Sequence, residues 1–130
     1  MKVISDDIKK GEFKSVYLLY GEEEYLKKQY RDRLKNAIAG DDTMNYSYYD
    51  SDNASAKDII DVCETLPFFA QKRLVIMENT GFLKSSNDEL ADYIKHIPDY
   101  LVVVMVEKDV DKRNKVYKAV DSVGYICEMK

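Results

Sequence analysis

Three stretches of the chain are almost entirely apolar and show no polar alternation. They are Val16 to Tyr20, Arg73 to Met77 and Leu101 to Val106. Uninterrupted runs of this length are typical of strands that are covered on both faces of a sheet. The pattern therefore predicts three inner strands, the first of which ends at Gly21.

Between these runs the apolar positions recur with a helical period. Leu26, Tyr30, Leu34 and Ile38 are spaced by four residues, which predicts an amphipathic helix over residues 23–39 that ends near Gly40. Similar patterns, with Ser55 as an N-cap and Pro67 and Pro98 as stops, predict further helices over residues 55–66, 90–97 and 116–120, and a short one around residues 4–8. Two weaker strands are expected over residues 45–49 and 124–128.

Strands and helices therefore alternate along the chain until five strands are complete. This order is typical of an α/β fold with a five-stranded, mainly parallel sheet flanked by helices. The 130 residues, 45% of them hydrophobic, are enough for one packed core, and no linker-like composition interrupts them. We expect a single domain over residues 1–130.

The charge balance limits the classes of partner. Lys and Arg total 20 against 24 for Asp and Glu, which gives a net charge of -4. Duplex DNA favours a basic protein surface, so the balance argues against a dedicated DNA-binding domain and leaves only local contacts. No apolar run is long enough to span a membrane, and residues 1–10 are too charged for a signal peptide, so we expect a cytoplasmic protein.

Two kinds of active α/β domain can be tested against the residues that follow the strands. A phospho-acceptor signalling domain needs a cluster of carboxylates for Mg²⁺ and an Asp nucleophile after the third strand, where this chain has Glu78 and Asn79. Its fourth strand also continues into Glu107 and Lys108, where a Ser or Thr is expected. The receiver-like signalling function is therefore a weak alternative.

A P-loop ATPase is the other alternative. Its phosphate site requires a glycine-rich loop followed by Lys and then Ser or Thr. The first strand is instead followed by one glycine, Gly21, and by the glutamates Glu22, Glu23 and Glu24. Acidic residues at a helix N-terminus interact with the helix dipole themselves and repel a triphosphate. We therefore expect no bound nucleotide and no other cofactor.

Other catalytic and metal-binding arrangements lack support in the sequence. His96 is the one histidine and has no Cys or His at metal-ligand spacing. Cys63 and Cys127 lie far apart inside apolar stretches, where reduced cysteines act as small hydrophobic side chains. Asp109 and Asp111 lack the glycine and distal glutamate of a calcium loop. We expect no catalytic residue and no metal site, and hence a protein that is not an enzyme.

The segment between the helix predicted over residues 55–66 and the following strand is unusually apolar for a connection. It contains Leu66, Pro67, Phe68, Phe69, Ala70 and Gln71. Exposing two phenylalanines forgoes roughly 1.5–3 kcal/mol of burial each, so the rings either reach the core or await a partner. Neighbours in an extended segment point in opposite directions, which makes the burial of both rings the less favoured outcome. We interpret the segment as a protein-binding element.

A basic cluster surrounds the start of the last predicted helix. Its members are Lys108, Lys112, Arg113, Lys115 and Lys118. Such a cluster is most often a solvated helix face. The alternative is contact with another subunit or with DNA phosphates, which we assign in particular to Lys112, Arg113, Lys115 and Lys118.

Three segments together carry a resemblance that covers nearly the whole chain. They are Val16 to Glu23, Leu66 to Val75 and Val110 to Tyr117. In these segments the chain resembles the N-terminal domain of the delta subunits of bacterial DNA polymerase III, the wrench of the clamp loader. The resemblance implies a RecA-like AAA+ domain without a functional P-loop, which agrees with the glutamates after Gly21.

The resemblance also implies a function, a site and partners. Phe68 and Phe69 would insert into a pocket of the beta sliding clamp and help to hold the ring open for loading on primed DNA. Some family members have Leu at the position of Phe68, which leaves the relative weight of the two rings open. Further partners would be the delta prime subunit and the tau/gamma ATPases, with DNA contacted only in the assembled complex. The family's two helical domains, a lid and a collar, are absent from this sequence.

Overall fold

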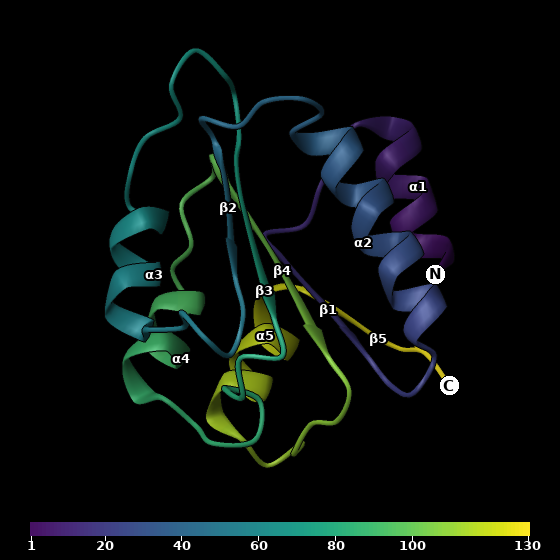
Figure 1. Cartoon of the computed structure of the whole chain (residues 1–130), viewed down its shortest axis with the longest axis vertical. Coiled ribbons are helices and arrows are strands. Elements are labelled where there is room, and N and C mark those ends of the chain that lie inside the picture. Colours follow the sequence, from purple (N-terminus) through teal and green to yellow (C-terminus); the bar gives the residue numbers. More distant parts are fainter.

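The computed structural model describes residues 1–130 as three layers, with one central sheet between two layers of helices (Figure 1). The strands are β1 (Val16–Tyr20), β2 (Tyr46–Tyr49), β3 (Arg73–Glu78), β4 (Leu101–Glu107) and β5 (Tyr125–Glu128). The helices are α1 (Lys2–Lys10), α2 (Glu24–Ile38), α3 (Ala56–Cys63), α4 (Asp88–Ile94) and α5 (Lys115–Val123). Every predicted element is present, with boundaries that shift by a few residues.

All strand pairs are parallel, in the order β2-β3-β4-β1-β5. The three predicted inner strands do lie inside the sheet, and every residue of β1 and β4 is buried. The two strands with the weaker sequence patterns, β2 and β5, are the outermost strands of the sheet. In this order β1 pairs with β4, although the two strands are far apart in the sequence. Val16, for example, lies opposite Val103. The predicted five-stranded parallel α/β fold is confirmed.

Each face of the sheet has its own hydrophobic core. Helices α1 and α2 cover one face, where Ile4 and Leu34 pack with alternate residues of the strands such as Leu19 and Val104. Helices α3, α4 and α5 cover the other face, where Leu18 and Val103 contribute to the second cluster. Because side chains alternate between the faces of a strand, one apolar run supplies both cores.

Helix α1 is attached to the sheet by a buried polar contact. The hydroxyl of Tyr17 on β1 donates to Asp7 Oδ2 at 2.7 Å, and Lys14 Nζ pairs with the same carboxylate at 3.0 Å. Burial, with Asp7 as a further cause, raises the pKa of Tyr17. The helix ends at Gly11 in a left-handed conformation (φ 70°).

The predicted stop of α3 at Pro67 is displaced by three residues. The helix ends at Cys63 with Glu64 as its C-cap, and Thr65 N donates to Val62 O at 3.0 Å in a tighter final turn. Ser55 is the N-cap, as predicted, with its hydroxyl accepting from Asp58 N at 3.4 Å. Proline disfavours helical geometry in the residue before it, so Leu66 already lies outside the helix.

No helix of the chain has both the length and the apolar composition needed to cross a membrane. Cys63 and Cys127 are buried free thiols, each in a different core cluster. No group of acidic, histidine and cysteine side chains has the arrangement of a metal site.

Candidate functional site

The connection between α3 and β3, residues 64–72, carries three of the eight large hydrophobic side chains that are exposed on the surface. Phe69 is 94% exposed, Leu66 71% and Phe68 52%. Ala70 and Gln71 are exposed as well, while Pro67 is half-buried. The structure thus brings all six predicted binding residues together in one loop, and neither phenylalanine reaches the core. We refer to residues Leu66 to Gln71 as the apolar loop.

The two rings lie against each other rather than on opposite sides of the loop. Their centroids are 4.4 Å apart in an edge-to-face arrangement. Phe69 has a φ of 54°, in the left-handed region, so the chain turns back at this residue. Our expectation that neighbouring side chains point apart assumed an extended segment, and the turn at Phe69 removes that assumption. The result is one joint aromatic surface.

Asn45, which directly precedes β2, fixes the backbone of Phe68. Its Oδ1 accepts from Phe68 N at 2.6 Å, and its Nδ2 donates to Phe68 O at 2.8 Å. The Asn45 side chain is itself oriented by Asp42, whose Oδ2 accepts from Nδ2 at 2.7 Å. This hydrogen bond from Asn45 is the main cause that lowers the pKa of Asp42. Asn45 is only 2% exposed.

Arg73, the first residue of β3, closes the base of the same loop. Its guanidinium donates to Thr65 O at 2.8 Å and to Leu66 O at 3.4 Å. Tyr100 assists, because its hydroxyl donates to Cys63 O at 3.1 Å. These donors satisfy carbonyl groups at and beyond the C-terminal end of α3 that have no partner within the helix. The loop is therefore anchored on both sides while its apolar side chains remain in solvent.

Five residues of this site were not identified from the sequence, among them Asp42 and Tyr100, which orient Asn45 and bind the end of α3. Asn45 and Arg73 act on the loop backbone, and Met44, 63% exposed, adds apolar surface next to Asn45 in the chain. A signal for Arg73 was present, because a charged residue at the start of a buried strand needs hydrogen-bond partners. Asn45 had no such signal, since its partner lies 23 residues away.

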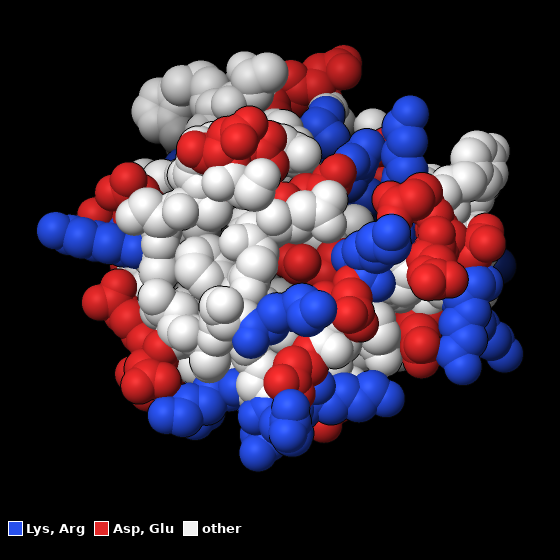
Figure 2. Space-filling view, turned by 60° about the horizontal axis from the view of Figure 1, so that its bottom comes forward, with Lys and Arg blue, Asp and Glu red and all other residues white.

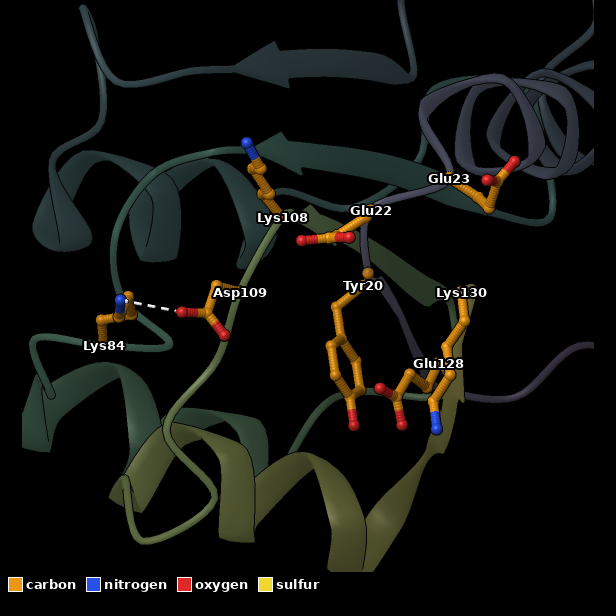
Figure 3. A pocket seen from close by; sticks show the side chains of 9 residues that line it. Tyr20, Glu22, Glu23, Lys84, Lys108, Asp109, Glu128 and Lys130 are labelled. Atoms are coloured by element: carbon orange, nitrogen blue, oxygen red, sulfur yellow. Dashed lines mark hydrogen bonds and ion pairs between the residues drawn. The ribbon is translucent and has the colours of Figure 1, made fainter.

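The apolar loop lies at the edge of the sheet where the strands begin (Figure 1). Nucleotides in open α/β folds bind at the other edge, beyond the carboxyl ends of the strands. That edge carries a cleft of about 720 Å³, lined by Tyr20, Gly21, Glu22, Glu23, Lys84, Lys108, Asp109, Glu128 and Lys130 (Figure 3). The apolar loop and the position of a nucleotide site are thus on opposite edges.

The backbone after β1 is already engaged by the protein itself. Gly21 N lies 3.2 Å from both Glu107 O and Lys108 O, and Glu23 N donates to Met129 O at 3.2 Å. A Cβ on Gly21 would lie 2.0 Å from Met129 O, so the segment after β5 packs directly against this turn. Two backbone N–H groups of the turn where a P-loop would bind phosphate, those of Gly21 and Glu23, therefore bind main-chain carbonyls.

Lys27 occupies the place of the P-loop lysine, six residues after Gly21. It is 2% exposed, and its Nζ donates to Glu24 Oε1 at 2.8 Å and to Glu107 O at 3.2 Å. The ammonium group is thus held inside the protein. Four carboxylates and three lysines line the cleft, and Lys84 pairs with Asp109 at 3.0 Å (Figure 3). The surplus of negative charge disfavours a triphosphate.

The basic cluster lies at this second edge, at the start of α5. Arg113 pairs with Asp111 at 3.1 Å, and Lys115 pairs with Asp88 at 3.1 Å. Figure 2, with this edge turned forward, shows acidic and basic side chains interspersed and no broad basic area. Lys112 and Lys118 are exposed and form no ion pair. The contact of this cluster with DNA or another subunit stays a prediction.

Glu78, which the sequence placed where a phospho-acceptor aspartate would stand, is also engaged. It forms an ion pair with Arg31 of α2. Glu107 at the end of β4 is buried, which raises its pKa, and its carboxylate accepts from Thr80 N at 3.2 Å. Neither carboxylate combines with others into a metal site.

These features define a parallel α/β domain in which the turn after the first strand is bound internally and an apolar loop is exposed at the opposite edge. A sequence model of the family described as "DNA polymerase III, delta subunit" matches residues 17–130. The chain belongs to this family of DNA polymerase III delta subunits. The resemblance read from the three sequence segments is confirmed.

Individual relatives agree with the family. The DNA polymerase III subunit delta of Bacillus subtilis is 31% identical over 136 residues, which cover 95% of this chain and 39% of the relative. The solved DNA clamp loader delta protein of B. subtilis has a TM-score of 0.87 and 30% identity, over 99% of this chain and 42% of that one. This chain thus spans about two fifths of these relatives.

A more distant structure shows the fold alone. The RuvB branch migration motor of Thermotoga maritima has a TM-score of 0.57 at 18% identity, over 99% of this chain and 43% of that one. The predicted AAA+ architecture is confirmed by these matches.

Proposed function

We propose that this chain is the clamp-contacting domain of a non-catalytic clamp-loader subunit, and that the apolar loop binds the beta sliding clamp. The observation that carries the proposal is the exposed pair of rings, Phe68 and Phe69, on an anchored backbone. Two adjacent aromatic side chains in solvent are costly for the free protein and are well suited to fill an apolar pocket. Family membership supports the sliding clamp as that partner.

The mechanism requires no chemistry from this domain. A protein that binds the open form of a ring more tightly than the closed form shifts the ring toward opening by that difference in affinity. The energy of the loading cycle would come from the tau/gamma ATPase subunits, with delta prime as a further partner. The closed turn at Gly21 and the internal ion pair of Lys27 support a role without ATP. The complex would act on primed DNA in the bacterial cytoplasm.

A titration of purified sliding clamp with the variant Phe68→Ala/Phe69→Ala tests the proposal. Hot-spot aromatics contribute about 2–4 kcal/mol, so the affinity should fall roughly 30-fold to 1000-fold. Tyr25→Ala is the matched control, because Tyr25 is an aromatic residue with 74% exposure at the start of α2, away from the loop. A well-folded double variant that binds the clamp as tightly as the unchanged chain would refute the proposal.

A second titration addresses nucleotide binding. Mg-ATP added to this chain in a calorimeter should give no binding heat, because the N–H groups of Gly21 and Glu23 already bind main-chain carbonyls and the cleft carries excess negative charge. A saturable signal would revive the ATPase alternative.

A further inference from the structure

The apolar loop is held in one conformation by a residue outside it. Asn45 makes a paired contact with a single residue, accepting from Phe68 N at 2.6 Å and donating to Phe68 O at 2.8 Å. A primary amide that meets both backbone groups of one residue imitates the pairing of a neighbouring strand. In the sheet Asn45 also binds β3, because its carbonyl accepts from Leu74 N at 2.9 Å. The side chain thus extends the β2–β3 pairing into the loop.

The conformation that Asn45 fixes is one that the loop would not keep by itself. Phe69 has a left-handed backbone, which is costly for a residue with a bulky side chain, and its ring is 94% exposed. Burial of the Phe69 ring does not offset the energetic cost of this backbone conformation in the free protein. The compensation comes from the neighbouring residue, where Asn45 binds both backbone groups of Phe68.

The side chain of Asn45 is in turn oriented by Asp42. Asp42 accepts from Asn45 Nδ2 at 2.7 Å and, through Oδ1, from Asn45 N at 3.1 Å and Met44 N at 2.8 Å. These contacts set which side of the amide faces Phe68 O, because only Nδ2 can donate to a carboxylate. A chain of polar contacts therefore runs from Asp42 through Asn45 to Phe68.

We infer that Asn45 is a positioning residue for clamp binding, which holds Phe68 and Phe69 in the binding conformation before the clamp is met. This inference rests on the proposed function and deepens it. A ligand that binds only one conformation has an apparent affinity reduced by the fraction of molecules in that conformation. Preorganisation by Asn45 raises this fraction without contacting the clamp. Asn45 itself is 2% exposed and so offers almost no surface to a partner.

The test compares clamp affinity and loop order in Asn45→Ala. If the binding conformation falls to about a tenth of the molecules, affinity should fall about tenfold. The hydrogen exchange of the Phe68 amide should accelerate in the free protein, while amides of β4 remain protected. Asn53→Ala is the matched control, because Asn53 is exposed and its Oδ1 accepts from Asp50 N in a turn. It should leave both readouts unchanged.

A milder variant covers the case in which Asn45→Ala fails to fold. Asp42→Ala keeps Asn45 but removes the acceptor that orients its amide, and it should weaken clamp binding by about threefold with faster exchange at Phe68. The inference is wrong if a folded Asn45→Ala keeps the clamp affinity of the unchanged chain or its rate of hydrogen exchange at Phe68. If Asn45→Ala does not fold, the same result in Asp42→Ala overturns the inference.

The two experiments distinguish failure of this inference from failure of the proposed function. Loss of binding in Phe68→Ala/Phe69→Ala combined with full binding in Asn45→Ala rejects the positioning role alone. Full binding in the double phenylalanine variant rejects the clamp-binding role of the apolar loop, and the positioning role of Asn45 with it.

Discussion

Lys27 Nζ lies 3.2 Å from the main-chain oxygen of Glu107, a residue 80 positions later in the chain. This contact joins the first turn of α2 to the end of β4 at the place where a P-loop protein would hold phosphate. The same carbonyl also accepts from Gly21 N at 3.2 Å. A lysine at the nucleotide-binding position is thus part of the packing of this domain.

Lys27 contributes to the stability of the fold more through the burial of its aliphatic side chain than through its charge. Lys27→Ala should lower the free energy of unfolding by about 2 kcal/mol or more, because it leaves a cavity beside Leu26 and the sheet. Lys27→Met should cost less than about 1 kcal/mol, since it keeps the volume and Glu107 O retains the hydrogen bond from Gly21. Urea denaturation measures both. Lys28→Ala, at the exposed neighbouring position, is the control and should be neutral.

Gly21 should tolerate no side chain, in contrast to another glycine with positive φ. Gly21→Ala would bring a Cβ to 2.0 Å from Met129 O and should destabilise the protein by more than about 3 kcal/mol. Gly11 has a φ of 70° with nothing within 4 Å of the added atom, so Gly11→Ala should cost only about 1 kcal/mol. Equal losses in thermal or urea unfolding of the two variants would contradict the close packing of Gly21 against the segment after β5.

The stability of the fold should decrease in alkaline solution. Burial raises the pKa of Cys63 from 9.0 to about 12 and that of Tyr20 from 10.0 to about 12. Between about pH 9 and 12 the unfolded chain therefore loses protons that the folded chain retains, and stability falls by about 1.4 kcal/mol per pH unit for each such proton. Below pH 9 both states hold these protons, so this contribution to stability is fully present there.

The pH dependence is measured by urea unfolding at a series of pH values from 8 to 11. Cys63→Ser replaces the thiol by a group that does not titrate, so its stability should decline less steeply above pH 9 than that of the unchanged chain. An identical slope in the two proteins would show that Cys63 is not the source of the effect.

Asn114 should contribute more to stability than the N-cap of α3. Its Oδ1 accepts from Val116 N at 2.7 Å and Tyr117 N at 3.1 Å, and its Nδ2 donates to Phe82 O at 3.0 Å. Asn114→Ala should cost about 2 kcal/mol, because a cap and a buried tertiary hydrogen bond are lost together. Ser55→Ala removes one longer contact of 3.4 Å and should cost about 0.5 kcal/mol. Thermal unfolding of the two variants checks the order.

The sequence was informative where the cause of a structure lies in neighbouring residues. The period of Leu26, Tyr30 and Leu34 predicts α2 because residues four apart share one helix face. The glutamates after Gly21 predict a closed phosphate site because their charge acts on the turn beside them. The apolar loop could be identified because a connection rich in phenylalanine conflicts with the usual polarity of connections.

The same reasoning misjudged the geometry of the loop. The sequence argument against burial of both rings assumed an extended segment with alternating side chains, whereas the rings of Phe68 and Phe69 touch and Phe69 takes a left-handed backbone. A positive φ in a phenylalanine is not encoded by its own preference. Here it is supported by Asn45, which the sequence places in a different strand region.

The sequence by itself determined the elements of this protein, its family and the apolar character of the candidate site. Only the tertiary structure decided the strand order, the position of the apolar loop on the edge opposite the closed nucleotide site, and the contact of Asn45 with Phe68. The physical reason is the range of the forces involved. Periodicity and charge act on neighbouring residues, whereas strand order and side-chain hydrogen bonds arise when segments far apart in the chain pack against one another.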